Sequence, residues 1–198
     1  MNKPFSIFLD AEDNLLCVIG ERLLGEFSEK YKIRGIAKKH RHAGSGIRQD
    51  ARQWNNAAAK GDIRLALMDL DALAPPQSRK KCPESEIRKA LSNQEKHEKF
   101  LLRVAVFESE SWLLADREGF ARFFSIPNKE SIPDNVDDLE YTKEHAYNII
   151  RACKGDVRKH KLAKKMLEFA KSRWKPKRAA KNSKSLRRTL ERLDKFSG

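Results

Sequence analysis

Two aspartates, Asp69 and Asp71, follow a short apolar stretch in the middle of the chain. The stretch runs from Leu65 to Met68 and Pro75-Pro76 comes after it, a pattern typical of a strand buried on both faces. Alternate residues of a strand point to the same side, so we expect the two carboxylates to lie together. Two such carboxylates repel each other unless a cation bridges them, and Mg²⁺ commonly uses one or two carboxylates plus substrate phosphates. The pair therefore indicates a metal site, and the structural alternative is a strand end with two solvated acids.

Acidic residues follow two other predicted strands in the same way. Glu12 comes after the strand expected at Pro4–Leu9, and Glu108 and Glu110 come after the strand expected at Phe100–Phe107. In open α/β sheets, ligands bind beyond the carboxyl ends of the strands. Three acidic strand ends at one edge would form a carboxylate pocket that a metal ion stabilises. For the acids near Glu12, the alternative is a role at the start of the next helix, as caps or as favourable charges.

The elements that would position these residues alternate between strands and helices. We expect strands at Pro4–Leu9, Tyr31–Ala37, from Ile63 onward and at Phe100–Phe107, and helices at Asn14–Phe27, Ile47–Lys60, Glu84–Ser92, Trp112–Phe124, Thr142–Ala152, Lys161–Lys175 and from Ser183 onward. This alternation predicts an α/β fold with a central, mostly parallel sheet flanked by helices.

The composition of the 198-residue chain points to an acidic polymer as partner. Lys and Arg number 42 against 28 Asp and Glu, which gives a formal net charge of +14. Such an excess of positive charge indicates nucleic acid as the first choice of partner and a membrane surface as the second choice. No apolar run approaches the ~20 residues of a spanning helix, and no signal-peptide pattern opens the chain. The cysteines Cys17, Cys82 and Cys153 form neither a zinc pattern nor a disulfide framework, so we expect reduced thiols and a cytoplasmic protein.

The C-terminal third is the most basic part of the sequence. A helix is expected at Lys161–Lys175, and in the last helix the leucines at 186, 190 and 193 are expected to face inward. Arg187, Arg188 and Arg192 surround these leucines. The region is a candidate phosphate-binding surface, and the alternative is a solvated helical surface.

The order strand–Glu–helix followed by strand–Asp-x-Asp resembles the Toprim pattern of topoisomerases, primases and overcoming-lysogenization-defect nucleases. The chain looks more closely like a small, stand-alone Toprim-like family over almost its whole length. The matching pieces are Leu67–Asp71 with the prolines after it, Phe100–Asp116, Ile132-Pro133, Lys143, and Trp174 with Ser185–Leu193. The stretch Arg103–Asp116 is specific, whereas Asp-x-Asp alone is not. The chain departs from the family pattern at Phe107, where an arginine is usual, and in 154–165, which lacks a Gly-Pro-containing stretch.

The resemblance implies Mg²⁺- or Mn²⁺-dependent phosphodiester chemistry, with Glu12 as general acid/base and Asp69 and Asp71 as metal ligands. We expect Glu12, Glu108 or Glu110 to assist in holding the metal, and Arg103 and Lys143 to orient the phosphate. Genes of this kind often lie beside an ATPase gene in phage-defence loci, so an ATPase partner is implied as well.

We therefore expect a metal-dependent nuclease of DNA or RNA, with a Toprim-like catalytic domain over 1–116 and a basic helical region over 117–198 packed on it. A homo-oligomer is compatible with this expectation. The main alternative is a non-catalytic nucleic-acid-binding or sensor subunit on the same scaffold. A haloacid-dehalogenase-type phosphatase also uses Asp-x-Asp, but there the aspartyl nucleophile follows the first strand, whereas Asp69 follows a later one, and Ala72-Leu73 stands where a threonine is usual.

Overall fold

The computed structural model describes residues 4–38, 45–69, 88, 91, 94–105, 108–139 and 141–196. Within these ranges four strands pair in parallel, in the order β2-β1-β3-β4. Their bounds are Phe5–Ala11 for β1, Tyr31–Lys38 for β2, Ile63–Asp69 for β3 and Phe100–Ala105 for β4. Helix α1 (Asn14–Gly25) joins β1 to β2, and helix α2 (Ser45–Ala59) lies between β2 and β3 in the chain. The predicted α/β fold with a parallel sheet is confirmed.

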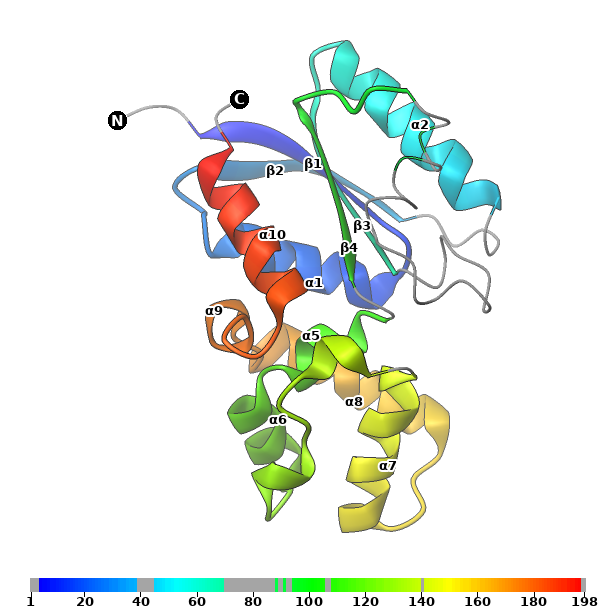
Figure 1. The fold of residues 1–198 in the computed structure, drawn as a ribbon, viewed down its shortest axis with the longest axis vertical. Helices are drawn as coiled ribbons and strands as arrows, with labels where there is room; N and C mark the ends of the chain where they lie inside the picture. Colours follow the sequence, from blue (N-terminus) through cyan, green and yellow to red (C-terminus); the bar gives the residue numbers. More distant parts are fainter. Residues whose placement is uncertain are drawn as a thin grey trace.

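The strand that carries Asp69 is buried on both faces of the sheet. Leu65 and Leu67 of β3 pack on the side of α1, whereas Ala66 and Met68 pack on the side of α2, against a cluster that includes Trp54. The four β3 residues are fully buried. Figure 1 shows α1 and α2 on opposite sides of the sheet. The apolar run at the centre of the sequence is thus a buried strand, as predicted, because parallel sheets are covered by helices on both faces.

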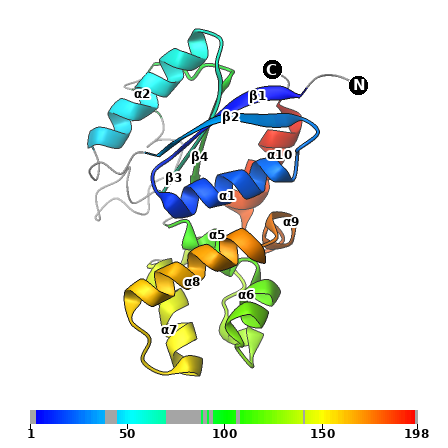
Figure 2. The same ribbon diagram turned by 180° about the vertical axis from the view of Figure 1, so that it is seen from behind.

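A group of helices follows β4 and lies beyond one end of the sheet (Figures 1 and 2). It comprises α5 (Glu110–Leu114), α6 (Arg117–Phe124), the 3-10 turns η2 (Lys129–Ser131) and η3 (Val136–Asp138), α7 (Thr142–Lys154), α8 (Lys159–Ser172) and α9 (Pro176–Ala179). Helix α8 packs against α1, which joins these helices to the sheet. The hydrophobic core is continuous from β1 through α1 into this helical group.

The last helix, α10 (Lys184–Lys195), returns to the sheet and packs against β4. Its buried leucines, at 186, 190 and 193, enter the same core as α1, as the leucine spacing predicts. Ser183 caps the helix by accepting a hydrogen bond from the backbone N–H of Leu186 (3.1 Å). The hydroxyl of Tyr31 on β2 donates to the carbonyl oxygen of Leu193 (2.6 Å). The predicted basic helical C-terminal region is confirmed, and the division of the chain after Asp116 stays a prediction.

The prediction of a single helix at Trp112–Phe124 is wrong, because the helix is interrupted between α5 and α6, where Asp116 caps the second helix. The carboxylate of Asp116 caps α6 through the backbone N–H of Gly119 (3.3 Å). It also accepts from the backbone N–H of Lys175 (3.0 Å) and pairs with Arg178, whose Nη2 lies 2.9 Å from Oδ2. Asp116 is fully buried, so these partners hold the break in place. The helix expected at Glu84–Ser92 lies mostly outside the described residues.

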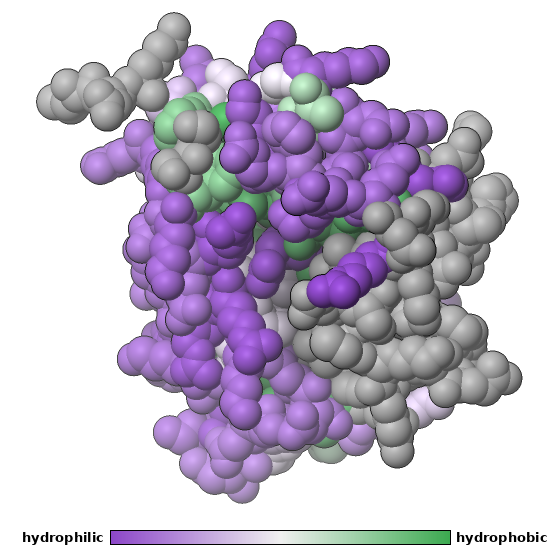
Figure 3. All heavy atoms as spheres, turned by 45° about the horizontal axis from the view of Figure 1, so that its top comes forward, coloured by the Kyte–Doolittle hydropathy of each residue, from purple (hydrophilic) through white to green (hydrophobic). Residues whose placement is uncertain are grey.

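The described surface is strongly polar. Figure 3 shows hydrophilic side chains over most of the described part of one face. Among the described residues, Ile36 and Tyr141 are the large hydrophobic residues that are exposed. The helices in the described ranges are all too short or too polar to cross a membrane.

Candidate active site

Glu12 and Asp69 meet at the carboxyl edge of the sheet. Glu12 directly follows β1, Asp69 ends β3, and these two strands are neighbours. The backbone N–H of Glu12 donates to the carbonyl oxygen of Leu67 (3.3 Å), which continues the strand pairing by one residue. The backbone N–H of Asp69 donates to Oε2 of Glu12 (3.1 Å). The glutamate side chain therefore reaches across the end of β3, and the structure brings together two of the acids that the sequence placed at this edge.

A buried serine connects this pair to the acids that follow β4. The hydroxyl of Ser109 lies 3.4 Å from Oδ2 of Asp69 and 3.5 Å from Oε2 of Glu110. A serine hydroxyl has one proton to donate, so it links one carboxylate at a time. Sequence reasoning missed Ser109, although its place between Glu108 and Glu110 at a strand end was a signal. The three strand ends β1, β3 and β4 thus contribute to one polar network.

Lys143 at the start of α7 extends the network. Its Nζ lies 3.4 Å from Oε1 of Glu110, and its backbone N–H donates to Oε2 of Glu108 (2.8 Å). Glu108 therefore binds the N-terminus of α7, where a carboxylate also interacts favourably with the helix dipole. The structure accordingly gives Glu108 a helix-capping contact and places Glu110 between Ser109 and Lys143.

Burial and charge shift the pKa values of Glu110 and Lys143. Glu110 is 5% exposed, and burial raises the pKa of its carboxyl group, while the Lys143 ammonium opposes that rise. The negative charge of Glu110 raises the pKa of Lys143, and burial of the ammonium opposes that rise. A desolvated acid beside a positioned cation is a common feature of functional sites.

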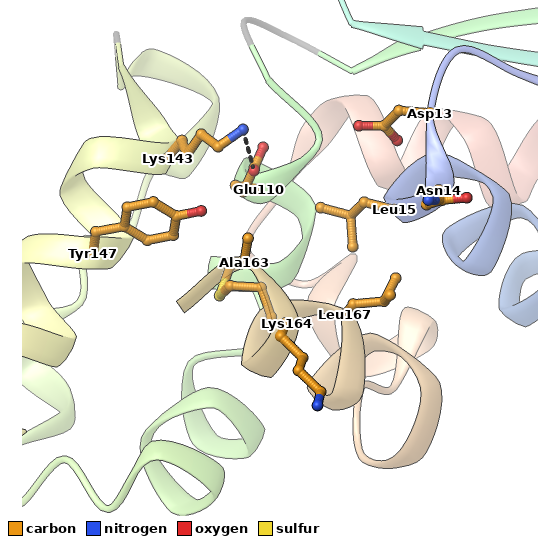
Figure 4. Close-up of a pocket in the computed structure, with 10 residues that line it drawn as sticks. Asp13, Asn14, Leu15, Glu110, Lys143, Tyr147, Ala163, Lys164 and Leu167 are labelled. Atoms are coloured by element: carbon orange, nitrogen blue, oxygen red, sulfur yellow. Dashed lines mark ion pairs between the residues drawn. The ribbon is translucent and has the colours of Figure 1, made fainter. Parts of the chain in front are cut away.

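A pocket of about 400 Å³ opens beside this network (Figure 4). It lies between the start of α1 and the helices α5, α7 and α8, and is lined by Asp13, Asn14, Leu15, Glu110, Lys143, Tyr147, Ala163, Lys164, Met166 and Leu167. Burial raises the pKa of the Tyr147 hydroxyl. Sequence reasoning missed both Tyr147 and Lys164. Tyr147 follows Lys143 by four residues on α7, so their shared helix face was a signal, whereas nothing in the sequence singled out Lys164.

The neighbouring acids of the first loop have other roles. Asp13 caps α1 by accepting from the backbone N–H of Leu16 (2.7 Å), which is the alternative role considered for the acids near Glu12. Asp10, fully buried in β1, pairs with Arg64, whose Nη1 lies 2.8 Å from Oδ2. Of the acids between residues 10 and 13, Glu12 is the one whose carboxylate contacts the end of β3.

The oxygen donors at this edge suit a hard divalent cation. Within the described ranges, however, no group of three His, Cys, Asp or Glu side chains is arranged to hold a metal ion, and Asp71 lies outside the described residues. Mg²⁺ is usually held by one or two protein carboxylates, with water and substrate phosphate completing its coordination. Asp69 and Glu12 fit such an open site in donor type, and they do not form a closed metal centre by themselves.

The predicted nucleic-acid-binding residues fall into separate groups. We call Glu12, Asp69, Glu108 and Glu110 the acidic edge, and Lys143 pairs with Glu110 of this group. Arg103 on β4 instead lies against α10, where its Nε donates to the hydroxyl of Thr189 (3.3 Å). The charges of Arg188 and Arg192 on α10 act on Arg103. Arg187 is two positions before Thr189, about 200° away around the helix axis, so it points to the opposite side of α10.

Comparisons with known proteins add one finding. Neither the curated proteins nor the solved structures include a match to this chain. A family model described as a domain of unknown function, DUF4276, matches residues 19–194. The match includes Asp69, Glu110 and Lys143 and begins after Glu12. Because the match covers most of the sequence, the chain belongs to the DUF4276 family.

Proposed function

We propose that this protein is a Mg²⁺-dependent nuclease of the Toprim type that hydrolyses phosphodiester bonds of DNA or RNA. The observation that carries the proposal is the contact between Glu12 and Asp69 at the carboxyl edge of neighbouring parallel strands. The Toprim pattern places a glutamate after one strand and an Asp-x-Asp pair after another, and the order of Glu12, α1 and β3 in this chain is the same. Ser109, whose hydroxyl lies within hydrogen-bond distance of both Asp69 and Glu110, adds a third strand end to the edge.

Each described residue has a role that its position supports. Asp69 would hold the metal with Glu12 beside it, and the resemblance assigns Asp71 to the same metal. A bound Mg²⁺ would supply charge neutralisation at the phosphate and a more acidic water. Glu12 would transfer a proton to or from the attacking or leaving oxygen. Lys143, fixed by Glu110, would orient a substrate phosphate that enters from the pocket.

The pocket beside the acids is large enough for part of a nucleotide. Its volume of about 400 Å³ is within the range of small-molecule sites. It combines apolar walls, such as Leu15 and Leu167, with the cation Lys143, whereas the ammonium of Lys164, another lining residue, is directed away from Lys143. A nucleoside could pack on the apolar wall while a neighbouring phosphate meets Lys143 at the acidic edge.

A cleavage assay tests this function. The purified protein is incubated with labelled single- and double-stranded DNA and RNA in Mg²⁺ or Mn²⁺, alone and with a candidate ATPase partner of the kind that the resemblance implies for phage defence. We expect cleavage that disappears in EDTA and in Asp69→Asn. The matched control is Asp62→Asn, which removes a charge directly before β3, at the opposite end of the strand. Cleavage that persists in EDTA, or in Asp69→Asn at the wild-type rate, would overturn the proposal.

A second candidate function is a non-catalytic nucleic-acid-binding or sensor subunit. It is favoured by the fact that no three potential metal ligands converge within the described parts of the chain, together with the net charge of +14. This candidate predicts binding to nucleic acid in EDTA and intact substrate in every metal-containing arm of the assay, with or without the ATPase.

A further inference from the structure

Four cations gather where β4, the outer strand of the sheet among the described residues, meets α10. They are Lys96, which precedes β4, Arg103 within β4, and Arg188 and Arg192 one turn apart on α10; we call them the basic edge cluster. The segments are far apart in the sequence, and α10 packs on β4 in the fold. Lys96, Arg188 and Arg192 are exposed, whereas Arg103 is half-buried. Lys96 was not singled out by the sequence, because its neighbours in space come from the end of the chain.

Hydrogen bonds hold the inner members of the cluster in place. Arg103 Nε donates to the hydroxyl of Thr189 (3.3 Å), and that hydroxyl donates to the carbonyl oxygen of Ser185 (2.9 Å). Lys96 Nζ donates to the carbonyl oxygen of Phe100 (2.9 Å). These partners are neutral oxygens, so they orient the cations without neutralising them.

The positive charges of the cluster act on one another. Lys96 is exposed as a whole residue, but partial burial of its ammonium lowers its pKa, and the positive charges of Arg192 and Arg103 lower it further. Burial likewise lowers the pKa of Arg103, and Arg192 and Arg188 add to the effect. Among the described residues, the carboxylates that form ion pairs do so with other cations, and none pairs with a member of the cluster. Like charges held this close repel unless an anion lies between them.

We infer that the basic edge cluster is a preformed phosphate-binding site for the backbone of a nucleic acid. Two exposed guanidinium groups, the guanidinium of Arg103 and the ammonium of Lys96 present charge-assisted donors suited to phosphate oxygens. A membrane surface fits less well, because amphipathic membrane-binding faces combine cations with large apolar side chains. The exposed large hydrophobic residues of the described chain, Ile36 and Tyr141, belong to neither β4 nor α10. The inference rests on the nucleic-acid ligand of the proposed function but requires neither the metal nor cleavage.

Arg187 provides a matched control on the same helix. It has the same charge and is exposed like Arg188. Thr189 marks the side of α10 that faces Arg103, and at about 100° per residue Arg187 lies about 200° from it. Removing Arg187 therefore lowers the net charge by the same amount without touching the cluster.

The first test measures binding to labelled duplex DNA and single-stranded RNA by fluorescence anisotropy in EDTA, over a series of salt concentrations. Lys96→Gln, Arg188→Gln and Arg192→Gln should each weaken binding and lower the salt slope on duplex DNA by about 0.9 per lost phosphate contact. Arg187→Gln should leave affinity and slope close to wild type. Equal losses in all four variants would show diffuse attraction by the net charge, and unchanged affinity in all four would show a solvated surface; either result overturns the inference.

The second test uses thermal unfolding, in which the same substitutions should increase stability instead of weakening binding. In phosphate-free buffer of low ionic strength, Arg188→Gln and Lys96→Gln should melt above wild type, because they relieve repulsion within the cluster. Added inorganic phosphate or DNA should raise the melting temperature of wild type more than that of either variant. A lower melting temperature in both variants without ligand would contradict the inference.

Two further outcomes separate the sources of phosphate. Stabilisation by inorganic phosphate without any cluster-dependent binding of DNA or RNA would assign the site to a small anion and overturn the nucleic-acid inference. Cluster-dependent binding to phosphatidylserine vesicles, with nucleic-acid binding unaffected by the cluster variants, would assign it to a membrane and overturn it as well. Absence of Mg²⁺-dependent cleavage would count against the proposed function alone, because these binding tests are made without metal.

Discussion

The acids Asp10, Glu12 and Asp13 at the end of β1 have different contacts and different roles. The sequence left open whether the acids at residues 10–13 serve catalysis or the start of α1. Asp13 takes the capping role, and Asp10 pairs with Arg64 in the sheet. The carboxylate of Glu12 instead accepts a hydrogen bond from the backbone N–H of Asp69. The capping role considered for Glu12 is therefore filled by its neighbour, and its side chain faces the acidic edge.

Replacing Glu12 by Gln should separate catalysis from stability. Gln has the same size and can still accept the N–H of Asp69, but it cannot carry a proton at neutral pH. A general acid/base role therefore predicts a fall in turnover of about 10²–10⁴ with nearly unchanged thermal unfolding and substrate affinity. Cleavage rate, binding and unfolding are measured on one sample. Near-wild-type turnover with a lowered melting temperature would make Glu12 structural and leave Glu110 as the candidate proton carrier.

Asp116 is a structural residue, and its replacement should affect folding. Its buried carboxylate caps α6 and binds both the backbone N–H of Lys175 and the guanidinium of Arg178. Asp116→Asn keeps the shape but removes the charge, and should lower the free energy of unfolding by about 2–4 kcal/mol. The control, Glu144→Gln, removes an exposed partner of Lys159 and should cost far less. Urea unfolding of both variants measures the difference, and equal losses would contradict the role given to Asp116.

Among the elements, the stretch Arg103–Asp116, the most specific part of the resemblance, contributes to the site and also packs against distant segments of the chain. The indole N–H of Trp112 donates to the hydroxyl of Ser185 (2.8 Å), and the indole N–H of Trp174 donates to the carbonyl oxygen of Trp112 (3.0 Å). Residues of α5 thus bind segments more than sixty positions later in the chain. Periodicity predicted a helix here, but it contains no information on such partners, nor on the break that Asp116 imposes.

The docking of α10 on the sheet should depend on pH through Tyr31. Burial, followed by the negative charge of Asp194, raises the pKa of this hydroxyl from 10.0 to about 12. Because the folded pKa lies above the unfolded one, the stabilisation is complete below about pH 10 and is lost as the pH rises toward 12. Within that window wild type should lose stability relative to Tyr31→Phe, at up to about 1.4 kcal/mol per pH unit.

Chemical unfolding of both proteins at pH 8 to 11.5 measures this difference. Above pH 10 the advantage of wild type over Tyr31→Phe should shrink, because the phenol must stay protonated to donate to Leu193. A difference that stays constant over the whole range would show that the Tyr31 hydroxyl titrates normally in the folded protein, and that its hydrogen bond does not hold α10.

For the whole molecule, the sequence was sufficient for the parallel strands of the sheet but not for their order or for the way the other parts meet. Alternating strands and helices predicted parallel strands, and the expectation that their carboxyl ends share one edge agrees with the contact between Glu12 and Asp69. The bridge through Ser109 and the pocket at Tyr147 depend on how α5, α7 and α8 pack. The grouping of Arg103 with Arg188 and Arg192, and the exclusion of Arg187, required the return of α10 to β4.

We propose that the acidic edge binds a divalent cation, and a metal titration measures this binding by itself. Isothermal titration of Mn²⁺ and of Mg²⁺ into the wild-type protein, Asp69→Asn and Asp62→Asn requires no knowledge of the substrate. We predict saturable binding to wild type and to Asp62→Asn, and a loss of at least about tenfold in affinity in Asp69→Asn, since removing one ligand charge weakens a site with few protein carboxylates. Equal metal affinity in all three proteins, or no binding to wild type, would contradict the claim.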